Sequence, residues 1–93
     1  MQEFKLYVTG SGNISQKAIE DLKSVLEEKL KEQYTLKIIN VLENPELAIK
    51  DKISATPTLV KDKPHRDVKL VGNANKDEMV IAVLGLEEKN ISA

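Results

Sequence analysis

A long amphipathic segment between two short apolar ones constrains the fold of this chain more than any other feature. Residues 4–8 alternate between strongly and weakly apolar side chains, which predicts a strand. From about Ile14 or Ser15 to Glu32, apolar residues recur at three- and four-residue spacing, which predicts a helix. Residues 35–41 are rich in β-branched side chains and predict a second strand. Strand, helix and strand form a βαβ unit, so we expect parallel strands with a right-handed crossover.

The same spacing assigns faces to these elements. In the first strand, Lys5 and Tyr7 are expected on the side opposite the apolar face. That apolar face holds Phe4, Leu6 and Val8. The helix stripe consists of Ala18, Ile19, Leu22, Val25, Leu26 and Leu30. The helix has two candidate N-caps, Asn13 and Ser15, and the sequence does not choose between them.

The second half of the chain predicts a short helix followed by two strands. Residues 44–46, Asn-Pro-Glu, combine a capping side chain, a proline for the first turn and an acid that the helix dipole favours. This helix is expected to end near residues 50–53. Strands are expected at Thr58–Lys61 and Val68–Val71, with Gly72 ending the second.

A final helix completes the predicted order β-α-β-α-β-β-α. Asn75, with Glu78 three residues later, resembles a capping box for a helix reaching about Leu84. This order is the topology of thioredoxin-like domains, which have one mixed four-stranded sheet. In that fold a Thr-Pro dipeptide precedes the third strand with a cis peptide bond, so we expect Pro57 to be cis rather than an ordinary trans turn. The expected core is Phe4, Leu6, Val8, Ile19, Leu22, Leu26, Ile38, Leu59, Leu70, Val80 and Val83.

Length and composition favour a single domain over residues 1–93. The net charge is −1 with acids and bases interspersed, which argues against a nucleic-acid partner. The apolar runs are too short to span a bilayer and the first residues lack signal-peptide features. We therefore expect a cytoplasmic protein without a membrane partner.

The residues that could carry chemistry argue against an enzyme. Thioredoxins hold reactive cysteines after the first strand, where this chain has residues 10–13, Gly-Ser-Gly-Asn, and no cysteine anywhere. The hydroxyls of Tyr7, Ser11 and Ser15 could suit a cysteine-less enzyme relative, but no second substrate-binding domain accompanies them. His65 is the single histidine and cannot build a usual metal site. We expect no catalytic residue, cofactor or metal, and therefore a binding module.

Several stretches resemble the KaiB family of circadian clock proteins. They are KLYVTG (5–10), YTLKIINVLENPELA (34–48), DKISATPTLV (51–60) and VKLVGN (68–73), and the resemblance extends over residues 3–86. It implies a noncatalytic protein that binds the N-terminal ATPase ring of KaiC, a hexameric ATPase and kinase. It also implies an effect on the phosphorylation and timing cycle of that ring, and recruitment of a further clock or signalling protein.

The resemblance further implies fold switching between a monomeric thioredoxin-like form and a tetrameric ground form. In the ground form, which is the alternative fold here, residues after about 50 are rearranged. This chain departs from the family at residues 62–66, which hold a single proline, and at Val83 and Gly85, where the family tends to have Gly and Asp. Valine in place of glycine favours the helix and hence the thioredoxin-like form. The alternative function is the sensor domain of a histidine kinase.

The family resemblance also implies a binding surface on the second helix and the proline loop. Its residues are Glu46, Lys50, Lys52, Ala55, Thr56 and Pro57. Lys52 matches a lysine in the family's Asp-Lys-Ile motif, although Asp51 and Lys52 could simply solvate a helix end. The edge of the second strand, around Lys37, is expected to pair with a further partner.

Overall fold

The computed structural model describes residues 2–63, 67–70 and 76–91, and these form four strands and three helices in the predicted order. The elements are β1 (Gln2–Val8), α1 (Asn13–Leu30), β2 (Tyr34–Asn40), α2 (Pro45–Lys50), β3 (Thr58–Lys63), β4 (Asp67–Leu70) and α3 (Lys76–Ile91). The thioredoxin-like order, with a strand at β3 and a helix at α3, is present rather than the rearranged ground form. Within the described residues, no helix is both long and apolar enough to cross a membrane.

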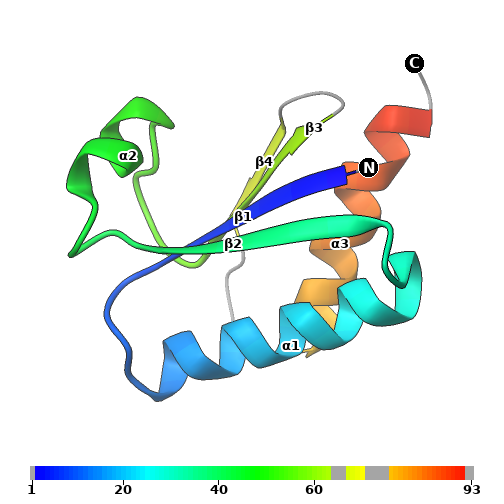
Figure 1. Ribbon diagram of the computed structural model, residues 1–93, viewed down its shortest axis with the longest axis horizontal. Helices are drawn as coiled ribbons and strands as arrows, with labels where there is room; N and C mark the ends of the chain where they lie inside the picture. The colour runs from blue at the N-terminus through cyan, green and yellow to red at the C-terminus, as the bar shows by residue number, and fades with distance from the viewer. Residues whose placement is uncertain (1, 64–66, 71–75, 92–93) are drawn as a thin grey trace.

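The strands form one mixed sheet in the order β2-β1-β3-β4 (Figure 1). β1 and β2 are parallel, with Leu6 opposite Ile38, as the βαβ pattern predicted. β3 is antiparallel to β1, with Leu59 opposite Leu6, and also antiparallel to β4. β1 is therefore a central strand and positions the residues at its carboxyl end.

The main core lies between the sheet and the two long helices, α1 and α3, which cover the same face (Figure 1). The buried residues of this core are Phe4, Leu6, Val8, Ala18, Leu22, Val25, Leu26, Leu59, Met79, Ala82, Val83 and Leu86. Of the expected core, Ile19, Ile38 and Val80 are only partly buried, and the Leu70 side chain lies outside the described part. Lys61 is also buried here, with its ammonium 5.8 Å from the centre of the Phe4 ring.

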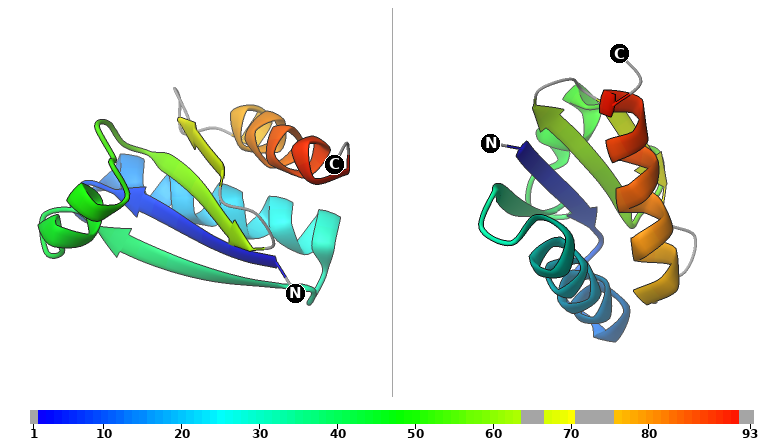
Figure 2. Two further views of the ribbon diagram at one scale, coloured as in Figure 1. Left: turned by 90° about the horizontal axis from the view of Figure 1, so that it is seen from above. Right: turned by 90° about the vertical axis from the view of Figure 1, so that its right-hand side faces the viewer.

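A second, smaller core lies on the opposite face, where α2 covers the carboxyl end of β1 (Figure 2). It contains Tyr7, Ile39, Ala48 and Val60. The prediction that Tyr7 simply points away from the apolar face is therefore incomplete, because Tyr7 is fully buried. A six-residue helix is enough to cover this end of the sheet, and the alternation along one strand does not reveal that.

Both predicted N-cap candidates of α1 are wrong. Gly12 is the N-cap, α1 begins at Asn13, and no side chain caps it. The Ser15 hydroxyl instead donates to the Thr9 carbonyl at 3.0 Å and so holds the β1–α1 loop. The helix ends at Leu30 rather than Glu32, because the next residue takes a positive φ of 53°.

The other helix ends differ from the predictions in detail. Asn44 is the N-cap of α2, but its side chain makes no cap hydrogen bond and donates to the Asn40 carbonyl at 3.3 Å. α3 begins at Lys76 and continues past Leu84 to Ile91. The predicted cap at 75, the strand end at 71–72 and most of the turn at 62–66 lie outside the described residues.

Candidate partner-binding surface

The predicted surface residues of α2 and the proline loop are neighbours at one end of the molecule. Glu46, Lys50, Lys52 and Ala55 are exposed, Thr56 is half-buried and Pro57 is buried. The Thr56–Pro57 peptide bond is cis. Pro57 therefore belongs to the base of the loop, and the residues before it form the accessible part.

The end of α2 has the geometry of a Schellman motif. The Ile53 amide donates to the Ala48 carbonyl at 2.9 Å, and the Lys52 amide donates to the Ile49 carbonyl at 3.1 Å. Lys52 has a φ of 59°, in the left-handed region that this motif requires and that glycine usually supplies. The most specific residue of the predicted surface thus has an unusual backbone conformation. We call residues 50–53 the exit turn of α2.

A group of charged and polar side chains lies directly beneath the exit turn. The Lys5 ammonium is 2.7 Å from Asp51 Oδ2 and 3.0 Å from Asp62 Oδ2. The Tyr7 hydroxyl donates to the same Asp51 Oδ2 at 2.5 Å and lies 3.3 Å from the Leu47 carbonyl oxygen. We call Lys5, Tyr7, Asp51 and Asp62 the Asp51 cluster. It joins the end of α2 to strands β1 and β3.

The ionisation of this cluster reflects its burial. Burial, with a contribution from the hydrogen bond to Asp51, raises the pKa of Tyr7 to about 12. Burial alone would lower the pKa of Lys5, but its hydrogen bonds to Asp51 and Asp62 outweigh that effect and raise the pKa. At neutral pH the cluster therefore holds a neutral phenol and a charged ammonium.

Side-chain hydrogen bonds also fix the loops around the surface. The Thr9 and Thr56 hydroxyls are 2.6 Å apart, which joins the β1–α1 loop to the proline loop. The Thr58 hydroxyl donates to the Ala55 carbonyl at 2.6 Å. Asn40 Oδ1 accepts hydrogen bonds from the amides of Gly10 and Leu42. These bonds give the surface a defined shape.

A mainly apolar groove of about 310 Å³ runs between α2 and the proline loop. It is lined by Thr9, Val41, Pro45, Ala48, Ile49, Ile53, Ser54, Ala55 and Thr56. Ile49 is 78% exposed, and Leu42, in the turn that follows β2, is 68% exposed. The sequence reasoning missed both. The available signal for Ile49 was an apolar residue between Ala48 and Lys50 in a helix too short to bury all of its faces.

Lys37 lies apart from this groove. It is exposed in the middle of β2, at the edge of the sheet, and lines a separate hollow with Glu3, Lys5 and Asp62. The structure therefore brings together the α2 and loop residues of the predicted surface but not Lys37.

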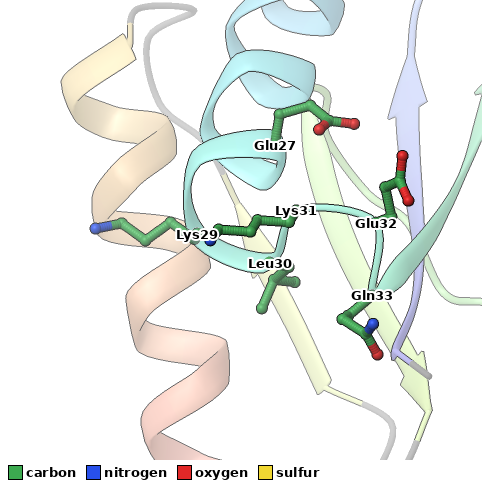
Figure 3. A pocket seen from close by; sticks show the side chains of 6 residues that line it. All are labelled: Glu27, Lys29, Leu30, Lys31, Glu32 and Gln33. Carbon is green, nitrogen blue, oxygen red and sulfur yellow. The ribbon is translucent and has the colours of Figure 1, made fainter.

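A further hollow, of about 550 Å³, lies at the carboxyl end of α1 (Figure 3). Figure 3 shows that the side chains of Glu27, Lys29 and Glu32 point in different directions there. They do not converge on a common point, so this hollow suggests no chemistry. Nor do the described residues contain any group of three histidine, cysteine or acidic side chains that could hold a metal ion.

Comparison with known sequences decides the family. The model of the KaiB domain matches residues 5–86. The chain belongs to the KaiB family. The circadian clock oscillator protein KaiB of Microcystis aeruginosa is 46% identical over 82 residues, which cover 88% of this chain and 79% of that protein. The protein of the same name from Trichodesmium erythraeum is 46% identical over 88 residues, covering 92% and 85%. KaiB1 of Synechocystis sp. is 45% identical over 82 residues, covering 88% and 78%.

Solved structures show which fold this KaiB-family chain has. The N-terminal domain of Synechococcus elongatus SasA matches with a TM-score of 0.75 at 24% identity, covering 95% of this chain and 84% of that one. The Drosophila melanogaster thioredoxin Deadhead matches with a TM-score of 0.70 at 17% identity, covering 91% and 80%. The fold is therefore thioredoxin-like, and the resemblance to the KaiB family is confirmed.

Proposed function

We propose that this KaiB-family chain is a noncatalytic binding module for the N-terminal ATPase ring of a KaiC-like ATPase and kinase. By docking on the ring it would modulate the phosphorylation and timing cycle of that enzyme. The observation that carries the proposal is the exposed surface of α2 and the proline loop, where Ile49 and Lys52 stand beside an apolar groove. Since such a ring uses cytoplasmic ATP, we place the interaction in the cytoplasm.

The chemistry of this surface supports a protein partner. Covering an apolar side chain as exposed as Ile49 removes apolar surface from water and so stabilises a complex with a protein partner. Lys50 and Lys52 follow it, are exposed, and would supply orientation, because charged groups at an interface select partners and fix register. The loop that holds thiols in thioredoxins contains no sulfur here, which supports binding rather than redox chemistry.

The experiment is a titration of the fluorescently labelled chain with the purified KaiC-type ring of the same organism. Lys52→Glu is expected to weaken binding by about 1–3 kcal/mol, because it reverses an interface charge. Lys31→Glu is the matched control. Lys31 is also exposed and also has a positive φ, but it lies at the end of α1. Equal affinities for the two variants and the unchanged chain would move the site elsewhere.

We also propose that the free edge of β2 recruits the further clock or signalling protein. In the described sheet β2 pairs only with β1, so its outer row of backbone groups is available for strand addition. Lys37→Glu should then leave binding to the ring intact but weaken recruitment of the second protein to the complex. Unchanged recruitment would contradict this assignment.

The oligomeric state follows from the fold in this proposal. We expect the thioredoxin-like form to be the monomer that binds the ring. A homotetramer or dimer would belong to another fold state, and fold switching needs two packings within a few kcal/mol. Light scattering, together with backbone chemical shifts for β3 and α3, tests this. A tetramer that keeps the chemical shifts of β3 and α3 would contradict the assignment.

A further inference from the structure

We infer that Tyr7 is a positioning residue of the partner-binding surface: its buried hydroxyl holds the Asp51 carboxylate and thereby keeps the exit turn of α2 in its left-handed conformation. The inference rests on the proposed function for its consequence, which is binding. Its structural part can be tested on the free protein.

The conformation of Lys52 has a cost that something must offset. A side chain with a β-carbon is disfavoured in the left-handed region, where glycine is the usual residue at this position of a Schellman motif. Lys52 nevertheless adopts a φ of 59° there. The two backbone hydrogen bonds of the motif are present in many helix ends that use glycine. They do not explain why a lysine is held in this geometry.

The Asp51 cluster supplies the additional interactions that stabilise the left-handed conformation of Lys52. Asp51 is the C-cap of α2 and directly precedes Lys52, so fixing its side chain limits the backbone on both sides. Its Oδ2 accepts a hydrogen bond from the Tyr7 hydroxyl and another from the Lys5 ammonium, at 2.5 and 2.7 Å. Both donors come from β1, which is paired with β2 on one side and β3 on the other in the described sheet.

Packing of the Tyr7 ring in the smaller core does not require its hydroxyl group. The ring is 0% exposed and packs with Ile39, Ala48 and Val60, a task that phenylalanine would perform equally well. A buried hydroxyl is costly unless it is hydrogen-bonded, and here its bond goes to the residue before the left-handed lysine. The geometry therefore assigns the hydroxyl to the exit turn.

Tyr7→Phe tests this with the smallest change. Hydrogen exchange by NMR on the free protein should show faster exchange at the amides of Lys52 and Ile53, whose bonds close the exit turn. The backbone amides that pair β1 with β3 should remain protected from exchange. If the exit turn occupies its binding conformation only about a tenth of the time, the Kd for the ring rises about ten-fold.

Two further variants separate positioning from general loosening. Tyr34→Phe is the matched control, because the Tyr34 hydroxyl also bonds to an acid, Glu27 at 3.0 Å, but far from the exit turn. It should change neither exchange at the exit turn nor the Kd. The double variant Tyr7→Phe with Lys52→Gly should restore protection of the Ile53 amide, since glycine adopts a positive φ without help.

The outcomes distinguish this inference from the proposed function. If Tyr7→Phe leaves both exchange at the exit turn and the Kd unchanged, the inference is wrong even though the ring binds. If the exit turn loosens while the unchanged chain fails to bind the ring, the structural part holds and the proposed function fails. Should Tyr7→Phe unfold, Asp51→Ala removes the acceptor of the Tyr7 hydroxyl and changes no core side chain, and the same predictions apply to it.

Discussion

At the scale of single residues, the proposed surface depends on side chains that are buried although the sequence pattern predicts them to be exposed. Tyr7 occupies a position expected to be polar, yet it is fully buried and bonds to Asp51 across 44 positions of sequence. Lys61 is likewise buried against Phe4. Alternation along a strand gives the direction of each side chain, but it does not say which other segment covers it.

The titration of Tyr7 makes this burial measurable. Its pKa is raised from 10.0 to about 12, so between these values the unfolded chain loses the phenol proton while the folded chain keeps it. The raised pKa of Lys5 acts in the same direction. Stability should therefore fall as pH rises above 10, by about 1–2 kcal/mol from Tyr7 by pH 12.

Urea unfolding of the unchanged chain and of Tyr7→Phe, at neutral pH and at pH 11, measures this contribution. Tyr7→Phe should lose less stability between the two conditions. Tyr34→Phe should lower the alkaline loss less than Tyr7→Phe does, because burial and the hydrogen bond to Glu27 raise the pKa of Tyr34 as well but the shift of Tyr7 is the large one. Equal alkaline losses in all three proteins would show that the Tyr7 phenol is not held as described.

At the scale of elements, the long helices and strands were predictable, and the short helix α2 carries the proposed binding surface. The apolar stripe of α1 and the βαβ unit follow from spacing alone, and the structure confirms them. α2 has six residues, too few to be stable without tertiary contacts, and its position over β1 depends on Ala48 and the Asp51 cluster. The N-cap of α1 was predicted at the wrong residue, whereas Asn44 is the N-cap of α2 as predicted but makes no side-chain cap bond. The side chains of Ser15 and Asn44 bond instead to the carbonyls of Thr9 and Asn40.

The exposed side of α2 gives a prediction at this scale. Ile49→Ser removes a side chain that is 78% exposed, so the free energy of unfolding should change by no more than about 0.5 kcal/mol. Binding to the ring should weaken by about 1–2 kcal/mol, because covered apolar area is lost. Urea unfolding and the ring titration measure the two quantities.

Ile81→Ser is the matched control, since Ile81 is 59% exposed on α3, outside the proposed surface. It should alter neither quantity appreciably. If Ile81→Ser weakens binding as much as Ile49→Ser does, the surface has been assigned to the wrong helix.

At the scale of the whole molecule, the sheet separates the main core from the candidate binding surface. One face carries α1, α3 and the main core, and the other carries α2, the smaller core and the candidate surface (Figures 1 and 2). The family motif at residues 51–60 spans the exit turn, the cis-proline loop and the start of β3. The sequence motif could therefore be located before the structure, whereas the Asp51 cluster and Ile49 required the packing of α2 on β1.

The most direct test of the account is an NMR titration of the isotopically labelled chain with the purified KaiC-type ring. We predict that saturating the protons of the ring lowers the signal intensity of residues 46–56 most strongly, because magnetisation passes only to residues in contact with the partner. Signals of α3, including Ile81 and Leu84, should be affected least. Loss confined to α3 or to the β2 edge around Lys37, or no loss at ring concentrations well above those in the cell, would contradict the account.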